Sequence, residues 1–201
     1  MAGGRLVEVA GAVLLGGASA RMGSDKAHLT LDGVALATRA ARLLTEICED
    51  VLLVGGGPPP DAPGRRVPDL EGPRCALRGI ASALAAARAE RVLVLATDLP
   101  LVTLDLLLAL VAWPPTDAVI PRPADGPQPL CALYRREPAL AAARAQLASG
   151  RLAAQQFAAR LDPAWLEGAE LARVDPAGTA LFNVNDPASL ERAGALLGGC
   201  A

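Results

Sequence analysis

A glycine-rich segment close to the start of the chain carries the residue types best suited to chemistry. It follows an apolar run at residues 7–15 and holds three glycines and two cations within eleven residues. Glycines let backbone N–H groups approach an anion closely, and cationic side chains neutralise phosphate charge. The segment therefore predicts a cradle for a nucleoside triphosphate, in which Lys26 lies near the α-phosphate. Its residues are Leu14, Leu15, Gly16, Gly17, Ser19, Arg21, Gly23 and Lys26.

This segment is neither of the two common phosphate-binding glycine loops. The pattern G-x-G-x-x-G is absent, and so is G-x-x-x-x-G-K-[ST], because Lys26 follows Asp25 and precedes Ala27. The alternative is a glycine-rich turn between a strand and a helix with solvated charges. The fixed spacing of Ser19, Arg21 and Lys26 directly after an apolar run favours phosphate binding.

Asp98 is the second candidate for chemistry, because it follows a predicted strand at residues 91–96 whose apolar run at 92–95 is typical of a strand buried on both faces. Ligands of α/β sheets sit at the carboxyl ends of the strands, so a carboxylate here can hold Mg²⁺, with Mn²⁺ as an alternative ion. A metal is needed where two phosphates react, since their charges repel until they are neutralised. The other possible role of Asp98 is to stabilise the start of a helix.

The elements that must position these residues follow from the alternation of apolar runs with amphipathic segments. This alternation predicts a Rossmann-like three-layer α/β/α sandwich with a mostly parallel sheet. We expect strands at residues 9–15, 51–54, 91–96, 118–121, 130–134 and 169–174. We expect helices at residues 35–48, 77–89, 104–112, 137–147, 152–161 and 188–197, the third of them capped by Thr103.

Composition limits the class of protein. Hydrophobic residues make up 52% of the 201 residues and aromatic residues only 2%, which predicts a core of leucine, valine and alanine. A net charge of −2 argues against a general nucleic-acid binder, and the apolar run at residues 7–15 is too short to span a bilayer. The four cysteines are dispersed, as in reduced thiols. We therefore expect a cytoplasmic protein with neither nucleic-acid nor membrane partners.

The stretch from Leu14 to Lys26 resembles the nucleotide-binding motif of the nucleotidyltransferase superfamily. The pairs Gly16-Gly17 and Asp25-Lys26 are most similar to the molybdenum cofactor guanylyltransferases. The resemblance runs along nearly the whole chain and implies one nucleotidyltransferase domain over residues 1–201. Within this domain, the first half, at about residues 1–120, would bind the nucleotide, and the second half, at about residues 121–201, would bind the acceptor. The family's use of the equivalent aspartate supports Asp98 as the metal ligand.

Three further motifs carry the resemblance. Asp69 lies where an aspartate of the family contacts the nucleotide, but the insertion of residues 74–76 before Leu77-Arg78-Gly79 departs from the family pattern, and a surface-turn aspartate is the alternative. The segment 182–187 is similar to the family's Asn-x-Asn-Thr-Pro, which implies that Asn183 and Asn185 lie near the pterin substrate. Arg135 ends a stretch similar to the family's acceptor-side strand and could reach an anionic substrate, unless it is simply solvated.

The resemblance implies transfer of GMP from GTP to the phosphate of molybdopterin, with release of pyrophosphate. Lys26, Arg21 and Asp98 would be the catalytic residues, and no general base is needed because a phosphate monoester is mostly dianionic near neutral pH. Other cofactor-assembly proteins or molybdoenzymes are further expected partners. The alternatives are a relative that uses CTP or another phosphate acceptor, and a non-catalytic nucleotide-binding protein. Three glycines directly follow Val54 and offer no polar side chain, so backbone groups would have to recognise the base.

Overall fold

The structure is a computed structural model that describes residues 8–16 and 26–198. Its strands are β1 (Val9–Leu14), β2 (Thr30–Leu31), β3 (Val34–Ala35), β4 (Val51–Val54), β5 (Arg65–Val67), β6 (Arg91–Ala96), β7 (Ala118–Pro121), β8 (Cys131–Arg135) and β9 (Ala164–Leu166). Its helices are α1 (Leu36–Thr45), α2 (Ala76–Ala86), α3 (Leu104–Val111), α4 (Arg136–Ala148), α5 (Ala154–Ala159), α6 (Gly168–Val174), α7 (Pro187–Gly198) and a short 3-10 helix (Lys26–His28). No helix within these residues is both long and apolar enough to cross a membrane.

A seven-stranded sheet in the order β5-β4-β1-β6-β8-β7-β9 forms the centre of the molecule. The neighbours β5, β4, β1 and β6 pair in parallel, and so do β7 and β9. Strand β8 runs antiparallel to both β6 and β7. The strands other than β8 therefore end at one edge of the sheet, where a ligand of an α/β protein is expected.

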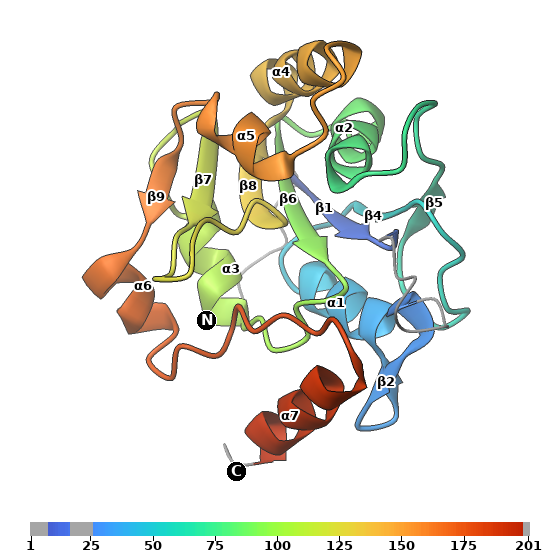
Figure 1. The fold of residues 1–201 in the computed structure, drawn as a ribbon, viewed down its shortest axis with the longest axis vertical. Helices are drawn as coiled ribbons and strands as arrows, with labels where there is room; N and C mark the ends of the chain where they lie inside the picture. The colour runs from blue at the N-terminus through green and yellow to red at the C-terminus, as the bar shows by residue number, and fades with distance from the viewer. Residues whose placement is uncertain (1–7, 17–25, 199–201) are drawn as a thin grey trace.

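Helices cover both faces of the sheet, as Figure 1 shows. Helices α1, α3 and α6 pack on one face and α2, α4 and α5 on the other, and each set buries its own cluster of aliphatic side chains. The prediction of a three-layer α/β/α sandwich with a mostly parallel sheet is confirmed. Both faces of the central strands are buried, which explains their continuous apolar sequences.

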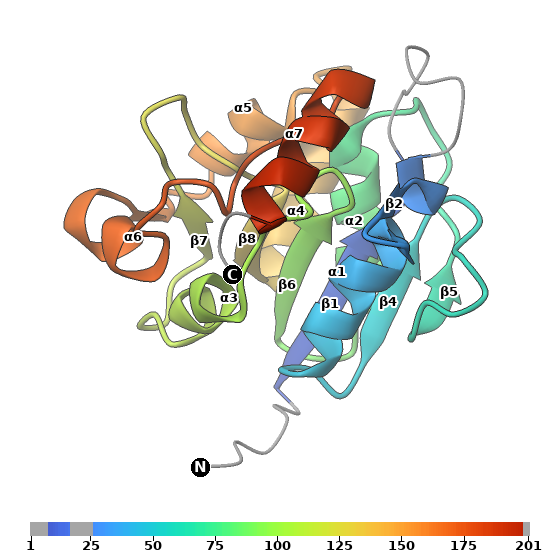
Figure 2. The same ribbon diagram turned by 90° about the horizontal axis from the view of Figure 1, so that it is seen from below.

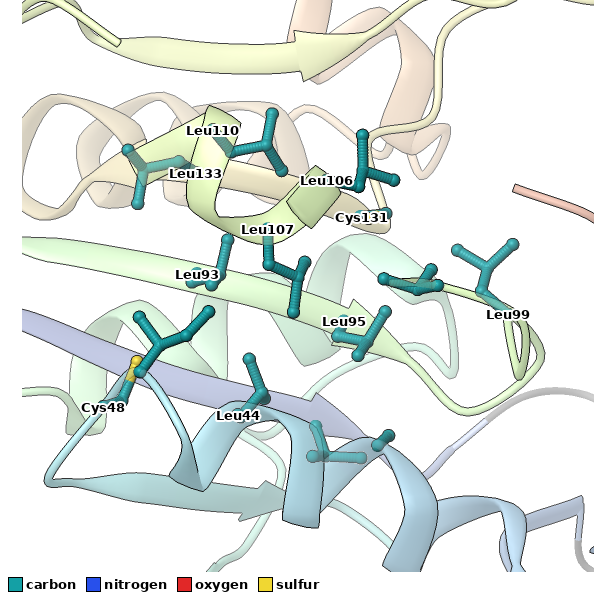
Figure 3. Close-up of a cluster of buried hydrophobic side chains, with 14 of the residues drawn as sticks. Leu44, Cys48, Leu93, Leu95, Leu99, Leu106, Leu107, Leu110, Cys131 and Leu133 are labelled. Atoms are coloured by element: carbon teal, nitrogen blue, oxygen red, sulfur yellow. The ribbon is translucent and has the colours of Figure 1, made fainter. Parts of the chain in front are cut away.

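Leucine side chains fill the layer between the sheet and α3. Figure 3 shows Leu106, Leu107 and Leu110 of this helix beside Leu93 and other leucines of the sheet. Thr103 caps the helix as predicted, because its hydroxyl accepts a hydrogen bond from a backbone N–H of the first turn at 3.3 Å.

A glycine in β1 brings this strand close to α1. A Cβ added at Gly11 would lie 3.1 Å from the Cβ of Leu44, which is tighter than an ordinary contact. The close packing of α1 holds β1 in place, and the carboxyl end of β1 borders the candidate site.

The prediction of a strand at residues 169–174 is wrong, because these residues form α6. Their alanine, glutamate, leucine and arginine residues favour a helix, and Leu171 is the one buried residue of this helix. The strand that pairs with β7 is β9, which ends at Leu166.

The hairpin of β2 and β3 was not predicted from the sequence, although a local signal was present. Asp32 and Gly33 join the two strands with φ angles of 50° and 74°. Such a pair is typical of the tight turn that matches the twist of a hairpin. Helix α7 lies beside this hairpin (Figure 2) and shares a small apolar cluster with it.

Asp186 holds the start of α7. Its carboxylate accepts a hydrogen bond from the backbone N–H of Ser189 at 2.7 Å. The hydroxyl of Ser189 accepts hydrogen bonds from the backbone N–H groups of Asn185 and Asp186 at 2.9 and 3.0 Å. This capping anchors the segment that precedes α7 over the end of the sheet.

Candidate active site

A pocket of about 330 Å³ opens at the carboxyl ends of β1, β4 and β6. It brings together six residues that the sequence singled out, and four of them carry polar side chains, namely Lys26, Asp69, Asp98 and Asn185. Leu14 and Gly16 also line this pocket. Leu15 is instead buried in the core, and its backbone N–H donates to the carbonyl of Val54. Gly17, Ser19, Arg21 and Gly23 lie outside the described residues.

The ammonium group of Lys26 is fixed by groups from the other end of the chain. Its Nζ donates to the carbonyl of Val184 at 3.0 Å and to Oδ1 of Asn185 at 2.9 Å, and it lies 3.8 Å from Oδ2 of Asp98. The Lys26 side chain is 13% exposed. Because folding already fixes the position of this ammonium group, binding of a phosphate does not have to order the lysine side chain.

Asp98 lies just after β6, and the backbone N–H of Val184 donates to its carbonyl at 2.8 Å. Among the described residues, its buried Oδ1 atom has no hydrogen-bond partner. Burial raises the pKa of this carboxyl, while the charge of Lys26 acts in the opposite direction. A buried carboxylate oxygen without a donor is costly, so this atom suits a cation ligand.

Asp69 enters the pocket from the segment after β5 and forms an ion pair with Arg78 of α2. Oδ2 of Asp69 lies 2.9 Å from Nη2 of Arg78, and Nη1 of Arg78 donates to the carbonyl of Gly72 at 2.6 Å. A Cβ at Gly55, whose φ is +78°, would lie 3.1 Å from Oδ2 of Asp69. Gly55 therefore leaves room for the carboxylate of Asp69.

Asn183 lines a second cavity of about 1150 Å³ and is absent from the lining of the first. This cavity lies beyond the carboxyl ends of β7 and β9, between α6 and α7. The two asparagines flank Val184, whose side chain is buried. The sequence assigned both amides to the acceptor, whereas the structure places them in different cavities.

Aromatic and cationic side chains meet at the second cavity. The guanidinium of Arg122 lies 4.5 Å from the ring centroid of Trp165 and pairs with Glu167. The guanidinium of Arg192 lies 5.5 Å from the ring centroid of Phe182. Cations at this cavity could meet an anionic group of a ligand.

The structure does not bring Arg135 to either cavity. Because β8 runs antiparallel to β6, Arg135 lies opposite Arg91, at the start of β6 and so at the far edge of the sheet from Asp98. Its guanidinium forms an ion pair with Asp117 at 2.7 Å. The prediction that Arg135 contacts the acceptor is therefore wrong, because the direction of β8 could not be known from the sequence alone.

Arg78 is a pocket residue that the sequence reasoning did not select. It is a cation in the helix sequence ALRGIASALAA, which is otherwise apolar or small. A charged side chain on a mostly apolar helix needs a partner of opposite charge nearby. The isolated arginine in this helix was therefore a signal that could have revealed Arg78.

At the carboxyl edge of this α/β sheet, a fixed lysine lies beside a carboxylate whose Oδ1 has no hydrogen-bond partner among the described residues, and such a site is suited to neutralising the charge of a phosphate ligand. Residues 11–163 match the family described as the MobA-like NTP transferase domain. The chain is 38% identical to the "Probable molybdenum cofactor guanylyltransferase" of Chloroflexus aggregans, over 94% of this chain and 95% of that one. It is 29% identical to the "Molybdenum cofactor guanylyltransferase" of Desulfosudis oleivorans, over 94% and 96%. The chain belongs to the MobA-like NTP transferase family.

Solved structures share the fold. The molybdopterin-guanine dinucleotide biosynthesis protein A of Archaeoglobus fulgidus superposes with a TM-score of 0.78 at 23% identity, over 94% of this chain and 99% of that one. The 2-C-methyl-D-erythritol 4-phosphate cytidylyltransferase of Thermus thermophilus gives 0.68 at 19% identity, over 92% and 97%.

Proposed function

We propose that this chain transfers GMP from GTP to the phosphate of molybdopterin, forming the guanine dinucleotide cofactor and pyrophosphate in the cytoplasm. The observation that carries the proposal is the fixed ammonium of Lys26, 3.8 Å from the partly buried carboxylate of Asp98, at the ligand edge of the sheet. The relatives named molybdenum cofactor guanylyltransferase match over 94% of the chain and support this choice of reaction.

The residues of the chain would lower the barrier by positioning and by neutralising charge. Lys26 would stabilise negative charge on the α-phosphate while the acceptor phosphate attacks the α-phosphorus in line. This acceptor is already mostly dianionic near neutral pH, since its second pKa is about 6, and it needs no base. His28 is not needed as a general base, and its Nε2 is hydrogen-bonded to the carbonyl of Gly57 at 2.8 Å.

Oδ1 of Asp98, which has no hydrogen-bond partner in the part of the chain that the structure describes, fits a divalent cation, and we assign Mg²⁺ to it, with Mn²⁺ as an alternative. Mg²⁺ commonly binds through one or two carboxylates together with substrate phosphates, so a single protein carboxylate is sufficient. When bound, the ion would neutralise phosphate charge.

The second cavity is the proposed acceptor site. It lies at the same edge of the sheet as the first, because β7 and β6 run in the same direction. The segment that carries Asn183 and Asn185 joins the two cavities. Asn183 would contact the pterin, and Arg122 or Arg192 could meet its phosphate.

Replacement of Asp98 by alanine tests the function. We expect Asp98→Ala to lower pyrophosphate release from GTP and molybdopterin by more than about 100-fold, because it removes charge stabilisation at the reacting phosphates. Glu49→Ala, which removes an exposed carboxylate from the turn after α1, is the matched control and should keep wild-type turnover. The circular dichroism spectrum and melting temperature of each variant would report on folding.

Two results would contradict the proposal. Wild-type turnover by Asp98→Ala would show that the metal ligand has been misassigned. Preferential use of CTP in a direct competition with GTP, with molybdopterin as acceptor, would overturn the choice of guanine and favour a cytidylyl transfer.

A further inference from the structure

Arg78 places a rigid guanidinium in the nucleotide pocket. Its side chain is 13% exposed and is held by Asp69 at 2.9 Å and by the carbonyl of Gly72 at 2.6 Å. Each terminal nitrogen of an arginine carries two N–H groups, and each of these bonds uses one of them. Arg78 also lines the pocket, so it can donate further hydrogen bonds to a ligand there.

Arg78 lies on the side of the pocket where we expect the nucleoside to bind. Lys26 and Asp98 lie on the side of β6, where the triphosphate would be neutralised. The opposite side is formed by the ends of β4 and β5, with Val54, Gly56 and Asp69. A nucleotide with its phosphates at Lys26 therefore extends its nucleoside toward Arg78.

Few polar side chains are available to read a base on that side. Among the described residues that line the pocket, those near β4 and β5 are Asp69, Arg78 and the exposed Arg74. The end of β4 itself offers Val54 and glycines, which carry no polar side chain. Base recognition by a side chain therefore points to the pair of Asp69 and Arg78.

We propose that Arg78 determines base specificity by donating hydrogen bonds to O6 and N7 of guanine, while Asp69 orients the guanidinium. This inference rests on the proposed guanylyl transfer. A guanidinium has donors only, and O6 and N7 of guanine are both acceptors. Adenine presents an amino donor at the position of O6, and cytosine presents its N4 amino group, so a fixed donor disfavours both bases.

Binding of GTP and 7-deaza-GTP, which lacks the N7 acceptor, tests this role without the acceptor substrate. For the wild-type protein we expect weaker binding of 7-deaza-GTP than of GTP by calorimetry. In Arg78→Met, GTP affinity should fall about 5- to 150-fold, the range for a bidentate pair. The difference between GTP and 7-deaza-GTP should disappear, and pyrophosphate, which has no base, should bind as before.

Two further variants separate specificity from structure. Arg78→Lys keeps a positive charge near Asp69 but loses the planar fork, so it should also lose the difference between the two nucleotides. Arg144→Met removes an exposed arginine from α4 and should bind both nucleotides as the wild type does. If Arg78→Met does not fold, the lysine variant decides the question.

An equal penalty for 7-deaza-GTP in the wild type and both Arg78 variants would overturn the inference, because Arg78 would then only support Asp69. A parallel loss of pyrophosphate affinity would overturn it too, because a base-reading residue does not touch that ligand. Failure of the proposed function is a separate result. It would appear as wild-type protein that transfers no GMP to molybdopterin, whatever the outcome of the binding measurements.

Discussion

The different positions of Asn185 and Asn183 lead to a prediction that separates the two substrates. Oδ1 of Asn185 accepts a hydrogen bond from Nζ of Lys26 at 2.9 Å, whereas Asn183 lines the second cavity. Both side chains belong to exposed residues, so replacement of either by alanine should leave the fold intact. Asn185→Ala should therefore impair nucleotide chemistry, and Asn183→Ala should impair binding of the acceptor.

The size of the effect follows from the bond that is lost. A hydrogen bond to a charged group contributes about 1.5–3 kcal/mol, which corresponds to about a 10- to 150-fold change in kcat/KM. The carbonyl of Val184 still holds Lys26 at 3.0 Å, so we expect a loss nearer 10-fold for Asn185→Ala. The loss should fall on kcat and on kcat/KM for GTP, because a misplaced ammonium stabilises the transition state less well.

The assay is steady-state release of pyrophosphate, with GTP and molybdopterin varied independently. Asn183→Ala is the matched control, since it removes the same amide two residues away. We expect it to raise KM for molybdopterin and to leave KM for GTP unchanged. If both variants raised KM for molybdopterin equally and left the GTP parameters unchanged, both amides would serve the acceptor and the reasoning would be refuted.

Two further predictions concern the elements that support the site. Hydrogen bonds from Ser189 hold the pKa of Asp186 below its usual range, so the ionised carboxylate stabilises the folded protein above the unfolded-state pKa of about 3.9. The difference in melting temperature between the wild type and Asp186→Ala should therefore be largest near neutral pH and shrink as the pH falls through the lowered pKa. A difference independent of pH would contradict this. Thr103→Ala removes the cap of α3 and should lower the free energy of unfolding in urea by about 1 kcal/mol, and an unchanged midpoint would show that the cap contributes nothing.

The sequence by itself determined most of the fold and the centre of the site. Alternating apolar runs and amphipathic segments are local patterns, and parallel strands joined by helices end at one edge of a sheet. Lys26 and Asp98 follow β1 and β6, which are adjacent parallel strands, so their meeting in one pocket could be predicted. Arg21 stays a prediction, because it lies outside the described residues.

Only the tertiary structure decided which other residues join Lys26 and Asp98. The direction of β8 places Arg135 at the far edge of the sheet, and strand direction depends on pairing with β6 and β7 rather than on the strand's own sequence. Asn185 reaches Lys26 across 159 residues, and a local motif cannot report a contact of that range. Arg78 was likewise revealed by its ion pair with Asp69, because the role of a partly buried charge depends on the partner that folding brings to it.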